Sequence, residues 1–144
     1  MIKLSKLLVS GLVLFGCCHL WASDFVIIAN PSVPITKLTQ DDLSDIYLLR
    51  TMIWEDGTRI IPVNREISSN TRAAFSARIL RQRQEALSNY WDKMRYKGLT
   101  PPLIQESDQA VLAFVQKIPG AIGYVKDSAT LRNIKILKLQ DETE

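Results

Sequence analysis

One short segment holds most of the chemistry that this sequence offers: residues 65–71, Arg-Glu-Ile-Ser-Ser-Asn-Thr. An apolar run typical of a β-strand precedes it, and a segment with helical spacing follows it. The first amides of a helix have no acceptor within the helix, and they lie at the positive end of its dipole. Such amides, together with nearby hydroxyl groups, can bind a small anion. Arg65 could add a charged, bidentate contact.

The candidate anion site therefore consists of Arg65, Ser68, Ser69, Asn70 and Thr71. A simpler interpretation also fits these residues, since Ser69 or Asn70 could serve only as the cap of the helix. Arg65 would then pair with a surface carboxylate. The side chain of Glu66 is expected to point away from the site. The local sequence leaves both interpretations open.

Other kinds of chemistry are restricted by the position of the cysteines and the histidine. Cys17, Cys18 and His19 all lie in the first 23 residues, where two lysines precede a short apolar run. This order is typical of a secretory signal peptide, so residues 1–23 are expected to be removed on export. The remaining chain then has no thiol nucleophile, no histidine base and no Cys/His metal site. We expect no enzyme, no cofactor and no bound metal.

Two cleavage sites fit the leader. The small residues Ala22 and Ser23 favour release of a soluble domain, whereas Leu-Phe-Gly-Cys, ending at Cys17, resembles a bacterial lipobox and would give a lipid-anchored protein. Both predict a periplasmic location. The formal charge of +3 falls to +1 when the two leader lysines are subtracted. Nucleic-acid binding depends on clustered positive charge, so nucleic acid is not an expected partner.

Residues 24–144 are expected to form a single domain, because no linker or internal repeat divides them. Apolar patterns predict strands over residues 24–30, 59–64, 121–125 and 133–139. Capping residues and helical spacing predict helices after Thr39, over 71–83, from about 87 to 97, and after Ser107. Strands and helices thus alternate. This order favours an α/β fold with a mainly parallel or mixed sheet flanked by helices.

Several expected details concern how these elements begin, end and pack. Thr39 and Asp42 have the spacing of a capping box. Leu43, Ile46 and Tyr47 fall on one face of the helix that follows and are expected in the core. Gly120 is expected to end a helix, and Gly123 to allow close packing of the backbone.

The segment order resembles that of the periplasmic phosphate-binding proteins of bacterial ABC importers, and most closely their small single-domain relatives. The similarity includes FVIIANPSVPITKLTQDDLSDIYLLR, a Trp-x-Asp-Gly turn, IIPVNREISSNT and IPGAIGYV, which together span most of residues 24–144. It implies a single lobe of the periplasmic-binding-protein fold. It also implies phosphate or a related small oxyanion as ligand, and an envelope or membrane transport protein as partner.

The phosphate loop of that family reads Arg-Ser-Asp-Gly-Ser-Gly-Thr, and Arg65, Ser69 and Thr71 match it. Ile67 takes the place of the aspartate, which can accept the proton of hydrogen phosphate, so weaker selection against sulfate is expected. Asn70 takes the place of the second glycine.

Length is a second departure from that family. Its full-size members close two lobes over the ligand, and this chain has residues for about one. Binding by one open lobe is expected to be weak, because hydrogen bonds to the ligand compete with water. An alternative function is an interaction or accessory module of an envelope complex that no longer binds a ligand.

Overall fold

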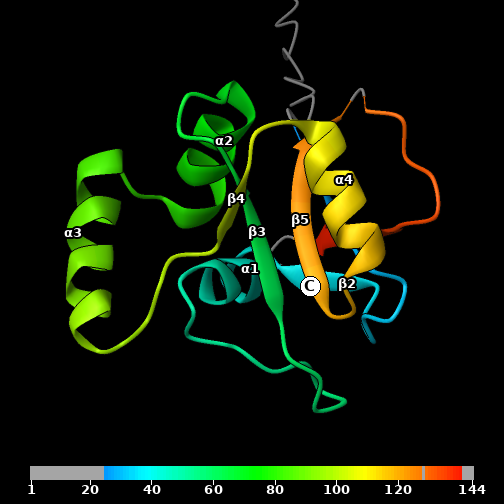
Figure 1. Ribbon diagram of the computed structural model, residues 1–144, viewed down its shortest axis with the longest axis horizontal. Helices are drawn as coiled ribbons and strands as arrows, with labels where there is room; N and C mark the ends of the chain where they lie inside the picture. Colours follow the sequence, from blue (N-terminus) through cyan, green and yellow to red (C-terminus); the bar gives the residue numbers. More distant parts are fainter. Residues whose placement is uncertain (1–24, 128, 141–144) are drawn as a thin grey trace, which may run out of the picture.

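A computed structural model of the chain describes residues 25–127 and 129–140 (Figure 1). The expected signal peptide and both of its cleavage sites lie outside the described residues. No helix within the described ranges is long and apolar enough to cross a membrane.

The centre of the molecule is a six-stranded sheet with the strand order β2-β6-β1-β5-β3-β4. The strands are β1 (Phe25–Ala29), β2 (Lys37–Thr39), β3 (Ile61–Arg65), β4 (Leu103–Gln105), β5 (Ala121–Lys126) and β6 (Lys135–Gln140). β1 pairs antiparallel with β5 and β6, whereas β2 with β6, β3 with β4, and β3 with β5 pair in parallel. β1 thus runs opposite to the other five strands. The sheet is mixed, and the predicted α/β class is confirmed.

Helices cover both faces of this sheet (Figure 1). They are α1 (Gln40–Tyr47), α2 (Asn70–Phe75), the π-helix η1 (Ser76–Leu80), α3 (Gln84–Tyr96) and α4 (Asp108–Lys117). α4 packs on one face through Val111 and Val115, while α1, α2 and η1 contribute to the core on the other face. Side chains alternate between the two faces along a strand, which is why Ile27 and Ile28 belong to different clusters.

Most predicted helix and strand boundaries are close to those observed. The capping box of α1 is present, with the Asp42 amide donating to Thr39 Oγ1 and the Thr39 amide donating to Asp42 Oδ2, both at 3.0 Å. The helix predicted over residues 71–83 ends earlier, at Leu80, because it continues from α2 as a π-helix and Arg81 adopts a left-handed conformation with φ 50°. Neither β2 nor β4 was predicted.

Four aromatic rings form the part of the core that lies beneath α2. Phe75 stacks on Tyr124 with ring centroids 3.9 Å apart, and it contacts Tyr47 and Phe25 at 4.6 and 5.5 Å. The Tyr47 hydroxyl donates to the Val63 carbonyl at 2.9 Å, so this buried polar group is paired. The cluster connects α1, α2, β1 and β5, and it fixes the position of α2 relative to the end of β3.

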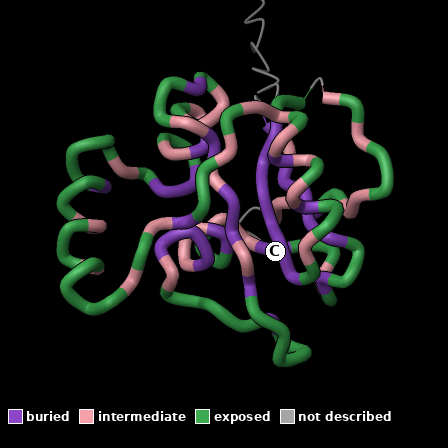
Figure 2. The backbone as a smooth tube through the Cα atoms, viewed as in Figure 1, coloured by how far each residue is buried: buried purple, intermediate pink, exposed green. Residues whose placement is uncertain are grey.

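Packing on the opposite face depends on Gly123 in β5. A Cβ atom at this position would lie 2.8 Å from Val111 Cγ1 and 3.2 Å from Val115 Cγ2. The absence of a side chain lets α4 approach the sheet closely, as predicted. By contrast, α3 stands away from the sheet and is largely exposed, with Leu87 as its buried residue (Figures 1 and 2).

Candidate functional site

The predicted junction between a strand and a helix is present, because β3 ends at Arg65 and α2 begins at Asn70. Ser69 is the helix cap: its Oγ accepts the Arg72 amide at 3.2 Å, and the residue is buried. Ser68 and Asn70 are exposed, and Thr71 is half-buried. The amides of Asn70 and Thr71 are the first two of the helix and have no acceptor within it. These two amides and three hydroxyl groups therefore lie in one short loop.

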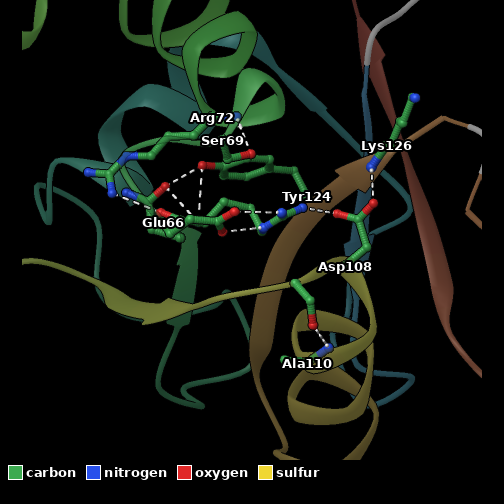
Figure 3. Close-up of polar contacts among 10 residues, drawn as sticks. Glu66, Ser69, Arg72, Asp108, Ala110, Tyr124 and Lys126 are labelled. Carbon is green, nitrogen blue, oxygen red and sulfur yellow. Dashed lines mark hydrogen bonds and ion pairs between the residues drawn. The ribbon is translucent and has the colours of Figure 1, made fainter.

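The Arg65 guanidinium is held by two carboxylates. Its side chain is 10% exposed. Nε donates to Glu66 Oε2 at 2.8 Å and Nη2 to Glu66 Oε1 at 3.0 Å, while Nη1 donates to Asp108 Oδ1 (Figure 3). The expectation that Glu66 points away was wrong, because its carboxylate matches the planar fork of the neighbouring guanidinium. The alternative interpretation, in which Ser69 caps the helix and Arg65 pairs with a carboxylate, describes the contacts observed.

Asp108 is a site residue that the sequence reasoning missed. It lies in the first turn of α4, after the cap Ser107, whose Oγ accepts the Ala110 amide at 3.0 Å. Its other carboxylate oxygen accepts the Lys126 amide at the end of β5, at 3.4 Å (Figure 3). β3 and β4 run in parallel with Arg65 opposite Gln105, so the segments that follow the two strands meet at the same edge. The unpredicted strand β4 is what brings Asp108 to Arg65.

The backbone around Arg65 is also fixed by polar side chains. Its amide donates to Asn64 Oδ1 at 3.1 Å and to the Tyr124 hydroxyl at 3.3 Å, and that hydroxyl contacts Asn64 Oδ1. Arg72 Nη1 donates to the Arg65 carbonyl at 2.8 Å. Burial raises the pKa of Tyr124 to about 12, so its hydroxyl keeps its proton at neutral pH. Arg65 is therefore fixed through hydrogen bonds to both its backbone and its side chain.

The charges at this site balance. Arg65 and Arg72 provide two positive charges, and Glu66 and Asp108 two negative ones. The hydrogen bond from Arg65 lowers the pKa of Glu66, which stays ionised, and raises the pKa of Arg65. A guanidinium has five N–H donors, of which three are used by the two carboxylates. One N–H on each terminal nitrogen of Arg65 remains for another acceptor. Within the described ranges, no three His, Cys, Asp or Glu side chains are grouped to hold a metal ion.

The Glu66 ion pair predicts acid sensitivity of the fold. A lowered folded-state pKa means that the contribution is complete above the ordinary glutamate value of 4.5 and is lost as the pH falls through the lowered value. We expect Glu66→Gln to reduce the loss of unfolding free energy on acidification below pH 4.5. Urea denaturation at a series of pH values measures this slope. Glu106→Gln, at an exposed glutamate outside the cluster, is the control, and equal slopes in both variants would contradict the assignment.

Two kinds of comparison place this lobe among known proteins. Residues 17–142 match the sequence profile of the PBP superfamily domain, and the chain belongs to this superfamily. The fold is similar to that of a putative phosphate ABC transporter substrate-binding protein with bound phosphate from Clostridium perfringens. That match has a TM-score of 0.66 and 24% identity, and it covers 81% of this chain and 44% of the other.

Two further structures have the same fold. An ABC-type phosphate transport receptor from Vibrio cholerae matches with a TM-score of 0.66 and 22% identity, over 83% of this chain and 48% of the other. PstS from Borrelia burgdorferi matches with a TM-score of 0.65 and 18% identity, over 81% and 47%. This chain thus spans less than half the length of each of the three proteins.

Proposed function

We propose that this chain is an exported, non-enzymatic solute-binding domain that binds phosphate or a related small oxyanion where β3 meets α2. The observation that carries the proposal is Arg65, a largely buried guanidinium with two unused N–H groups, held by Glu66 and Asp108 at the end of the strand that leads into α2. Membership of the PBP superfamily supports a solute-binding role. A part in phosphate ABC transport, with a membrane transport protein as partner, is the physiological setting we infer from the likeness to phosphate-binding relatives.

The groups available at the junction suit a partly protonated oxyanion. The amides of Asn70 and Thr71, the hydroxyls of Ser68 and Thr71, and the remaining N–H groups of Arg65 would donate to its oxygens. Ser69 would act through the helix cap, which fixes the first turn. Hydrogen phosphate carries a proton that a carboxylate can accept, whereas sulfate does not at neutral pH. Glu66 or Asp108 would supply this acceptor in place of the aspartate that Ile67 replaces.

Calorimetric titration of the purified protein with phosphate, and in parallel with sulfate, tests this function. We expect saturable but weak binding of phosphate and none of sulfate. Arg65→Ala should weaken phosphate binding by about 1–3 kcal/mol, the usual contribution of a hydrogen bond to a charged group. Thr71→Ala is the second variant. Thr71 is half-buried and uncharged, so this substitution removes a hydroxyl group without breaking an ion pair.

The control for this titration is Arg50→Ala. Arg50 is an exposed arginine whose Nη1 lies 3.3 Å from Asp45 Oδ1, outside the junction. It should bind phosphate as the parent does, and circular dichroism establishes that each variant is folded. Equal phosphate affinity in all four proteins, or no phosphate heat at all, would rule out the site.

The neutralised state of Arg65 favours a second candidate function. Two carboxylates of the chain itself, Glu66 and Asp108, already pair with this guanidinium. A ligand-free accessory module of an envelope complex would need no more than this. Its signature is a specific envelope protein whose capture survives both phosphate depletion and Arg65→Ala. Crosslinking that recovers no specific partner would count against it.

A further inference from the structure

A cavity of about 430 Å³ lies between α2, η1, α3 and the segment that enters β4. None of the five residues of the proposed oxyanion site lines it. Its volume falls within the range of small-molecule sites in proteins. Tyr47, Leu80 and Leu87, all buried, form part of its wall, so the inner part of the cavity belongs to the hydrophobic core.

The charged residues of the cavity wall are Glu66, Arg72 and Arg95. The Glu66 carboxylate is engaged on both oxygens by Arg65. Arg72 uses Nη1 for the Arg65 carbonyl, which leaves most of its five N–H donors for another acceptor. Arg95 donates to Asp92 at 2.8 Å and is well exposed. Arg95 is thus paired with Asp92, whereas Arg72 keeps unused donors and the Glu66 carboxylate in the same wall is already paired with Arg65; this arrangement favours an anion at Arg72.

Apolar side chains surround the same cavity where it opens to solvent. Ile67 is 67% exposed and Ile104 is 54% exposed, and Trp91 is half-buried beside them in the lining. Large apolar surface in contact with water is unfavourable, and neither isoleucine contributes to the two core clusters. An inorganic ion would leave this surface wet. A ligand with an apolar body would cover it.

We propose that this cavity binds an organic anion, with its acidic head at Arg72 and an apolar body of about the size of an aromatic ring against Ile67, Trp91 and Ile104. The binding energy then has two sources, a charge-assisted hydrogen bond to a guanidinium and the removal of apolar surface from water. The cavity shares Glu66 and Arg72 with the surroundings of Arg65 but contains none of the five residues of the proposed oxyanion site, so its ligand can be tested separately from phosphate binding there.

Phenyl phosphate and inorganic phosphate are a matched pair of probes, because they share a head group and differ in the apolar body. We expect phenyl phosphate to bind the purified protein at least about tenfold more tightly, with quenching of Trp91 fluorescence that disappears in Trp91→Phe. Ile104→Ser should remove most of this advantage and leave inorganic phosphate unaffected. Arg72→Gln should weaken phenyl phosphate by about tenfold.

The control is Ile136→Ser, which alters a similarly exposed isoleucine, 50% exposed, in β6 and outside the cavity lining. It should bind both probes as the parent does. Equal affinities for the two probes, or equal behaviour of the Ile104→Ser and Ile136→Ser variants, would overturn the proposal. Phosphate binding that responds to Arg65→Ala without any gain from the phenyl group would retain the oxyanion site and overturn this one. Tight phenyl phosphate binding that is lost in Ile104→Ser, with no heat from inorganic phosphate, would support the cavity site and overturn the oxyanion site.

Discussion

Phe75→Ala is expected to lower the free energy of unfolding by about 3–5 kcal/mol, the usual cost of removing a fully buried aromatic ring. Phe75 is fully buried and stacks on Tyr124 with ring centroids 3.9 Å apart. Loss of the ring leaves a cavity between α2 and the sheet, and it removes the contact that holds the helix start beside Arg65. Urea denaturation followed by circular dichroism measures the change.

The matched control for this prediction is Phe114→Ala. Phe114 lies in α4 on the opposite face of the sheet and is only partly buried. Its truncation should cost clearly less, because part of its surface is already in contact with water. Equal losses in the two variants would mean that the aromatic cluster does not contribute more to stability than the packing of α4.

Gly120→Ala is the second substitution with a large expected effect, about 3 kcal/mol from two sources. Gly120 has φ 76°, a conformation that costs an alanine about 1 kcal/mol or more. An added Cβ would also lie 2.2 Å from the Arg59 carbonyl oxygen, and relieving such overlap typically costs about 1–3 kcal/mol. The Gly120 carbonyl accepts Trp54 Nε1 at 3.0 Å and the Ile61 amide at 3.1 Å, so any shift also weakens the start of β3.

Gly98→Ala separates the two sources. Gly98 has almost the same φ, 77°, and an added Cβ would meet no atom within 4 Å. Only the conformational cost of about 1 kcal/mol should remain in this variant. Thermal or urea denaturation of the two proteins gives the difference directly. If both lose the same amount, the contact with Arg59 carries no cost.

Long periodic segments and capping residues allowed most of the fold to be predicted. The strand at 121–125 has an unbroken apolar run, and α1 has both its cap and a clear apolar face. The strands β2 and β4 escaped prediction because each has three residues, too few to show a period, and Leu103 and Ile104 of β4 are exposed on opposite faces of an edge strand. The reversed direction of β1 follows from its pairing with β5 and β6, which no local pattern encodes.

The candidate site was only partly predictable for a related reason. The start of α2 and its cap are local features: the sequence predicted a helix from about Thr71 with Ser69 or Asn70 as cap, and the helix begins at Asn70 with Ser69 as its cap. The partner Asp108 is 43 residues from Arg65, and it reaches the guanidinium only because β4 lies beside β3. The direction of the Glu66 side chain was not predictable from a local pattern, because Glu66 follows the end of β3 at Arg65 and the alternation of side chains along a strand does not extend to it.

The most direct test of oxyanion binding at the junction is an NMR titration of the ¹⁵N-labelled protein with phosphate. We predict that the amide signals of Asn70 and Thr71 and the Nε–H signal of Arg65 shift together along one saturation curve, and that sulfate at the same concentration leaves them in place. No shift at about 10 mM phosphate, or shifts confined to residues outside the loop between β3 and α2, would contradict the proposed site.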